Sequence, residues 1–107
     1  MIERKKYDLA YRILEKKYEY MPDAFTTKWL GIIDLSRKRM ENAAKYLNMS
    51  VNLKGDDAQV LFNLAGAYAM ENKFEKAYDA INRCLEIDSE FPGALNLKRQ
   101  IVVILKK

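Results

Sequence analysis

Few side chains in this sequence are of the types that carry out catalysis. Its 107 residues include no histidine and a single cysteine, Cys84. Histidine is the side chain whose unperturbed pKa suits a general base near neutral pH, and Cys and His are the usual zinc ligands. A lone cysteine also forms no disulfide within the chain. The sequence has no glycine-rich phosphate loop and no nucleophile-elbow motif. We therefore expect a protein that is not an enzyme and that needs no metal or cofactor.

The basic side chains could bind phosphate groups instead. Lys and Arg outnumber Asp and Glu by 19 to 15, which gives a net charge of +4. Basic runs combined with aromatic side chains are typical of nucleic-acid binding, and here the runs occupy residues 4–6, 16–17 and 37–39. However, acidic residues interleave with the first two runs, and the tyrosines fall mainly on helix stripes that must be buried. Nucleic-acid binding is therefore a disfavoured alternative.

A repeated unit is the more informative pattern. Residues 34 positions apart match in size and polarity, as in the pairs Leu30 with Leu64, Ala43 with Ala77, Leu47 with Ile81, and Ser50 with Cys84. A fixed period of this length indicates that one supersecondary unit has been copied. We therefore expect function on a repeated surface rather than in one catalytic pocket. Cys84 is expected to fill a site for a small side chain, where a buried thiol is inert.

The repeated segments carry a family resemblance. The residues concerned are Trp29-Leu30-Gly31, Asn63-Leu64-Ala65 with Tyr68, the small pair Ala43 and Ala77, and Asp88-Ser89 after Cys84-Leu85-Glu86-Ile87. This pattern resembles the tetratricopeptide repeat (TPR) family, with one unit at residues 24–57 and a second at residues 58–91. The first unit departs from the pattern, because Asp34 stands where Tyr68 stands in the second and Lys54-Gly55 replaces the usual proline.

The resemblance implies an all-α fold, an antiparallel helix-pair solenoid of about six helices. Apolar spacing and helix-breaking residues predict helices at residues 3–20, 24–36, 40–53, 57–71 and 74–87, and a sixth helix that Asp88-Ser89 caps and that has Pro92 in its first turn. We expect one domain over residues 1–107. Residues 1–23 resemble half a repeat, residues 24–57 and 58–91 form two repeats, and residues 92–107 form a C-terminal helix.

In this family the first helices of successive pairs line a concave groove. The resemblance therefore implies that the groove residues are Phe25, Lys28, Trp29, Ile32 and Ser36 in the first repeat, with Gln59, Phe62, Asn63, Gly66 and Met70 in the second. Aromatic and aliphatic area with a few hydrogen-bonding groups suits an extended or helical peptide. We expect the apolar members to provide contact area, while Lys28, Gln59 and Asn63 bind the ligand backbone or a polar side chain of the ligand. In an alternative interpretation, Trp29 covers the core between helices.

A specific carboxylate-binding mode of the family is poorly matched. Lys28 and Asn63 stand where chaperone-binding members carry a Lys and an Asn that hold a C-terminal carboxylate. The other positions of that clamp differ here, because Ile32 replaces an Asn, and Gly93 and Leu97 replace basic residues.

Both ends of the predicted stack look apolar and uncovered. The first helix resembles the second helix of a preceding pair whose first helix is missing, and apolar residues surround most of the last helix. Two interpretations remain open: an excised segment of a longer array, or an oligomer that forms through the terminal helices. The sequence shows no signal peptide and no membrane span, so we expect a cytoplasmic scaffold with a protein or peptide partner.

Overall fold

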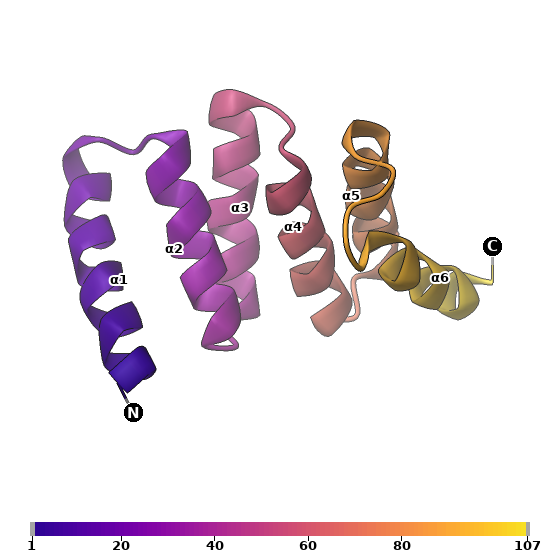
Figure 1. Cartoon of the computed structure of the whole chain (residues 1–107), viewed down its shortest axis with the longest axis horizontal. Coiled ribbons are helices and arrows are strands. Elements are labelled where there is room, and N and C mark those ends of the chain that lie inside the picture. Colours follow the sequence, from indigo (N-terminus) through magenta and orange to yellow (C-terminus); the bar gives the residue numbers. More distant parts are fainter. Residues whose placement is uncertain (1, 107) are drawn as a thin grey trace.

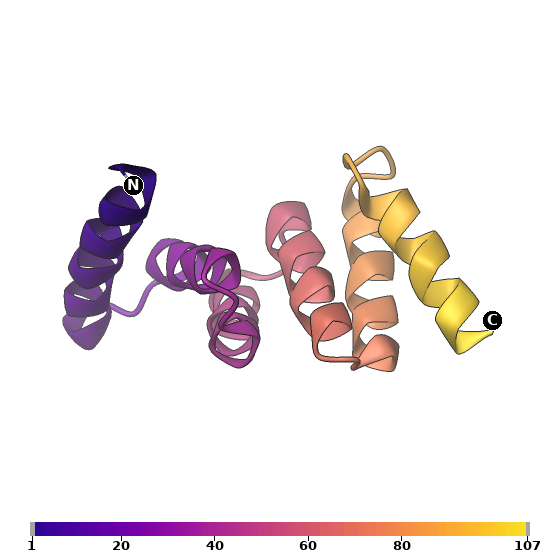
Figure 2. The same ribbon diagram turned by 90° about the horizontal axis from the view of Figure 1, so that it is seen from below.

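The computed structural model describes the backbone of residues 2–106 and the side chains of residues 8–106. Within this part the chain forms six α-helices and no strand: α1 (Ile2–Tyr20), α2 (Ala24–Ser36), α3 (Met40–Lys54), α4 (Ala58–Met70), α5 (Phe74–Ile87) and α6 (Ala94–Leu105). They stack side by side in chain order, with α1 at one end and α6 at the other (Figures 1 and 2). The basic run at residues 4–6 has its side chains outside the described residues.

The all-α helix-pair architecture expected from the sequence is confirmed. Short connections join α2 to α3 and α4 to α5, so the helices of each pair run antiparallel (Figure 1). No helix in the described part of the chain combines the length and the apolar character that crossing a bilayer requires.

The two repeats begin and turn with the same local chemistry. Asp23 caps α2, because its carboxylate accepts a hydrogen bond of 2.7 Å from the backbone N–H of Thr26. The hydrogen bonding with Thr26 lowers the pKa of Asp23, and the neighbouring Lys17 ammonium acts in the same direction. Asp57, 34 residues later, caps α4 through a bond of 2.9 Å from the N–H of Gln59. Lys38 and Asn72 both have a φ of 62° in the turn inside each pair.

The start of the last helix was predicted incorrectly. α6 begins at Ala94 rather than Pro92, and Gly93, with a φ of 82°, is its N-cap. The Asp88 carboxylate does not cap this helix, because it accepts a hydrogen bond of 3.0 Å from the N–H of Glu90. Asp88 therefore stabilises the turn that precedes α6.

Small residues set the distance between the helices of a pair. Gly31, Ala43, Ala65 and Ala77 are all buried. A Cβ atom added to Gly31 would lie only 2.7 Å from Cγ of Leu47, so α2 and α3 approach as closely as a glycine allows. Their burial places these small side chains where the two helices of each pair meet.

We predict opposite effects for two glycine substitutions. Gly31→Ala overpacks the contact with Leu47, which costs about 1–3 kcal/mol and outweighs the ~1 kcal/mol gain in helix propensity. Gly66 is the matched control, because an added Cβ there meets no atom within 4 Å. Gly66→Ala should therefore raise the urea midpoint, whereas Gly31→Ala should lower it. A rise for both variants would show that α2 and α3 are not tightly packed at Gly31.

Candidate functional site

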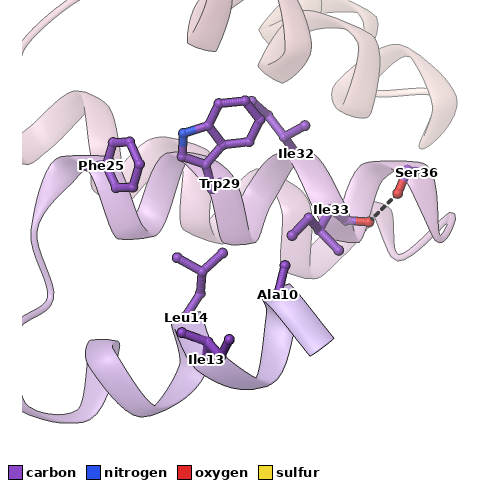
Figure 3. A pocket seen from close by; sticks show the side chains of 8 residues that line it. All are labelled: Ala10, Ile13, Leu14, Phe25, Trp29, Ile32, Ile33 and Ser36. Atoms are coloured by element: carbon purple, nitrogen blue, oxygen red, sulfur yellow. Dashed lines mark hydrogen bonds between the residues drawn. The ribbon is translucent and has the colours of Figure 1, made fainter. Parts of the chain in front are cut away.

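An apolar pocket lies between α1 and α2 (Figure 3). It has a volume of about 400 Å³. We call it the α1–α2 pocket, and its lining residues are Ala10, Ile13 and Leu14 from α1 with Phe25, Trp29, Ile32, Ile33 and Ser36 from α2. The Ser36 hydroxyl donates a hydrogen bond of 2.7 Å to the carbonyl of Ile33, so it is already used within its own helix. The pocket therefore offers contact area and little polar recognition.

Two aromatic side chains form the outer wall of the pocket. Phe25 and Trp29 lie one turn apart on α2 with their ring centroids 6.4 Å apart, and they are 60% and 36% exposed. The ammonium group of Lys17 lies 5.4 Å from the centroid of the Phe25 ring and 3.4 Å from the carboxylate of Asp23. The rim near the start of α2 is thus charged, while the floor is apolar.

Polar contacts hold α1 against α2 and so keep the pocket in shape. The Tyr11 hydroxyl on α1 donates a buried hydrogen bond of 2.9 Å to the carboxylate of Asp34 on α2. Arg37, which follows α2, forms an ion pair with Asp8 and lies 5.0 Å from the centroid of the Tyr11 ring. These contacts join the two helices at the end of the pocket nearest Ser36.

The Tyr11–Asp34 contact explains why the first repeat departs from the family pattern. In the second repeat Tyr68 takes the place of Asp34, and its hydroxyl accepts a hydrogen bond of 2.6 Å from the amide of Asn48 on α3. In both repeats the first helix of the pair, which we call the leading helix, is thus hydrogen-bonded to the helix before it through one large and one small polar side chain. We call the second helix of each pair the trailing helix. The large side chain, Tyr68, is on α4 in the second repeat. In the first repeat the large side chain, Tyr11, is on the preceding helix α1, and the small one, Asp34, is on α2.

Burial changes the titration of this pair. Asp34 is fully buried, and its second carboxylate oxygen has no hydrogen-bond partner among the described residues. Burial raises the pKa of Asp34, although the hydrogen bond from Tyr11 and the charge of Arg39 act in the opposite direction. Burial and the neighbouring carboxylate also raise the pKa of Tyr11, so the phenol stays protonated and remains a donor.

The other predicted groove residues lie on α2 and α4 but do not line the α1–α2 pocket. The Lys28 ammonium pairs with Asp57 at 3.5 Å, and the Asn63 amide donates a hydrogen bond of 3.0 Å to the carbonyl of Gln59 within α4. Phe62 packs on Phe91 with ring centroids 5.1 Å apart, and so contacts the turn before α6. Gln59 and Met70 are exposed.

The structure thus brings together Phe25, Trp29, Ile32 and Ser36, but it joins them to α1 rather than to α4. Ala10, Ile13 and Leu14 were missed by the sequence-based reasoning. Their positions could have been found, because Ala10 and Ile13 precede Ala44 and Leu47 on α3 by the same 34 residues. Cys84 is fully buried, and burial raises the pKa of its thiol.

Comparison with known proteins identifies the fold. No family model and no curated protein matches the chain. Among solved structures, it is similar to the first TPR domain of Spaghetti (RPAP3) bound to the HSP90 peptide SRMEEVD, with a TM-score of 0.90 and 21% identity over 99% of this chain and 85% of that one. It is also similar to MamA, with a TM-score of 0.90 and 20% identity over 97% of this chain. The chain spans 61% of the length of MamA. The helix pairs therefore define a helical-repeat protein, and the repeat is that of the TPR fold.

We predict that Asp34→Asn changes how stability depends on pH. Because the folded-state pKa of Asp34 is raised above its ordinary value of 3.8, folding favours the protonated carboxyl. The stability that this group contributes is fully present below that value, and is lost as the pH rises through the folded-state pKa. Asparagine does not titrate, and its side-chain oxygen can still accept from Tyr11. The unfolding free energy of the variant, relative to the unmodified chain, should therefore rise between about pH 4 and about pH 7.

Urea titrations at several pH values measure this difference. Asp79→Asn is the matched control, since the Asp79 side chain is 75% exposed, and it should leave the pH profile nearly parallel to that of the unmodified chain. A constant difference between Asp34→Asn and the unmodified chain across this range would contradict the raised pKa of Asp34.

Proposed function

We propose that this chain is a protein-interaction module that binds a segment of another protein in the α1–α2 pocket. The observation that carries the proposal is the exposure of Phe25 and Trp29 beside an apolar hollow of about 400 Å³. Contiguous exposed apolar surface on a water-soluble protein marks interaction sites, and this volume is in the range of ligand pockets.

The chemistry of the pocket favours large apolar side chains as ligands. Burial of one Leu or Phe side chain contributes about 1.5–3 kcal/mol, and the walls offer aromatic rings that are common at binding hot spots. A charged anchor finds no partner on this floor, because the Ser36 hydroxyl is bonded to Ile33 and Lys28 is paired with Asp57. We therefore propose that Phe25, Trp29 and Ile32 contact apolar anchors of the partner.

The similar RPAP3 domain supports a peptide as the partner, since it is bound to a segment of HSP90. That peptide, SRMEEVD, is acidic. The pocket described here is apolar instead, so the proposed ligand differs in chemistry from the HSP90 segment.

A peptide library can test the proposal directly. Random 16-residue peptides displayed on phage are selected on the immobilised chain, and the selected peptides are titrated in solution. Trp29 is the only tryptophan of the chain, so a peptide without tryptophan that enters the pocket should change its fluorescence. Phe25→Ala should weaken binding by about tenfold or more, since it removes most of an aromatic contact.

Met70→Ala is the matched control, because Met70 is 66% exposed, much as Phe25 is 60% exposed. Neither substitution opens a core cavity, so both variants should keep the melting temperature of the unmodified chain. Equal losses for the two variants would place part of the site on α4. Peptides that bind without changing Trp29 fluorescence, and that tolerate Phe25→Ala, would refute the proposed site.

A further inference from the structure

From the geometry of α1 we infer that the site takes an amphipathic helix of a partner protein, which packs antiparallel to α1 on the face that corresponds to the faces of α3 and α5 covered by α2 and α4. This inference rests on the proposed function, because the helix occupies the same α1–α2 pocket. It adds the conformation, the orientation and the charge pattern of the ligand.

The repeat period shows that α1 is the second helix of a pair. Its last residue, Tyr20, precedes the last residue of α3, Lys54, by 34 positions. The capping carboxylates that follow, Asp23 and Asp57, are separated by the same interval. α1 is therefore equivalent to α3 and α5, each of which has a leading helix of its own pair packed against it: α2 covers α3, and α4 covers α5.

Equivalent apolar residues are buried on α3 and α5 but exposed on α1. Ala43 and Leu47 on α3 are fully buried, and so are Ala77 and Ile81 on α5. The equivalent residues on α1, Leu9 and Ile13, are 62% and 61% exposed. These positions bear apolar side chains on all three helices, but within the described part of the chain no helix covers α1 as α2 covers α3 and α4 covers α5. A helix that took the place of α2 or α4 would bury Leu9 and Ile13.

The α1–α2 pocket lies where such a helix would pack. In the first repeat α2 contacts α3, the trailing helix of its own pair, and also α4, the next leading helix. A helix over α1 would likewise contact the next leading helix, which is α2. The pocket joins these two surfaces, since Ile13 and Ala10 line it from α1 while Trp29 and Ile32 line it from α2 (Figure 3).

Lys16 favours acidic residues in the first turn of the bound helix. The equivalent residues Ser50 and Cys84 are small and buried, and the Ser50 hydroxyl donates a hydrogen bond of 3.0 Å to the carbonyl of Ala24, the first residue of α2. Lys16 is exposed at this position of α1, so its ammonium would face the first turn of the bound helix. A helix N-terminus repels a cation such as Lys16. Acidic residues in the first turn of the bound helix would pair with Lys16 and would also interact favourably with the dipole of that helix.

The α6 helix of a second copy is a poor candidate for this position. Ala94 and Ile101 are buried like Val60 and Ala67 on α4, so α6 follows the register of a leading helix. However, Lys98 and Arg99 stand where α4 has Leu64 and Ala65. A copy of α6 placed over α1 would hold these two cations against Leu9 and Ile13. The observations thus favour a partner helix of about 13 residues, the length of α2 and α4, with an apolar stripe and an acidic first turn.

A helix of the chain itself supplies the probe. A peptide of residues 57–71 contains α4 and has no tryptophan. Two forms are compared, one with Ala58→Glu and Gln59→Glu and one with Ala58→Lys and Gln59→Lys, and each is titrated to millimolar concentration against the full chain. The acidic form should change Trp29 fluorescence saturably, gain helical circular dichroism on binding, and bind at least about fivefold more tightly than the basic form.

Three protein variants make the test specific. Ile13→Ala should weaken binding of the acidic peptide by about tenfold, whereas Ile87→Ala, at an isoleucine that is 49% exposed on α5, should leave binding unchanged. Lys16→Glu should reverse the preference between the two peptides. This reversal would not follow from a purely structural role of Lys16.

The alternative outcomes overturn the inference in distinguishable ways. Absence of binding by both peptides, or binding that is insensitive to Ile13→Ala or to Lys16→Glu, would refute the helix-completion model. If library-selected peptides still depended on Phe25 in that case, the proposed function would stand without it. Sedimentation of the peptide-free chain as a dimer that Ile13→Ala converts to a monomer would show that a second copy covers α1.

Discussion

The structure depends on one packing constraint, which is that each trailing helix must be covered by the leading helix of its own pair. The side chains that α3 and α5 direct at their leading helices are fully buried, and a glycine or alanine on the leading helix allows the close approach. This contact recurs every 34 residues and generates the stack. α1 has the apolar residues of a trailing helix, and Leu9 and Ile13 are exposed, so the same constraint marks α1 as part of the candidate binding surface.

An uncovered helix at the end of a stack must be held by other means. Here Tyr11 and Asp34 form a buried hydrogen bond between α1 and α2, and Arg37 pairs with Asp8 at the same end of the pocket. A buried carboxyl is expensive to desolvate, as the raised pKa of Asp34 indicates. These contacts hold α1 in position against α2 in the absence of a ligand. A pocket that is formed in advance reduces the ordering entropy that a partner must overcome.

The fold could be predicted from the sequence further than the site could. The 34-residue period, the helix pairs and the matched small residues Ala43 and Ala77 are local or repeated features, and the spacing of residues in the sequence predicts each of them. The start of α6 was misplaced because Gly93 adopts a left-handed conformation that no periodic pattern reveals. The contact of Phe62 with Phe91 could not be predicted from the repeat, because Phe91 lies outside the repeated helices. The α1 wall of the pocket does not follow from the family resemblance, which implies a groove lined by the first helix of each pair.

The two ends of the stack differ in a way that composition does not show. Both terminal helices are rich in apolar residues, yet α6 has Lys98 and Arg99 at the positions that would face a following helix, whereas α1 has Leu9 and Ile13 facing the place of a preceding one. The Lys98 ammonium lies 6.0 Å from the centroid of the Tyr78 ring, and packing another helix on this face of α6 would bury two cations against apolar side chains, which is unfavourable. At α1 the same addition would bury apolar surface and leave Lys16 at the edge, where a carboxylate can reach it. The proposed docking surface for a helix therefore lies on α1 and not on α6.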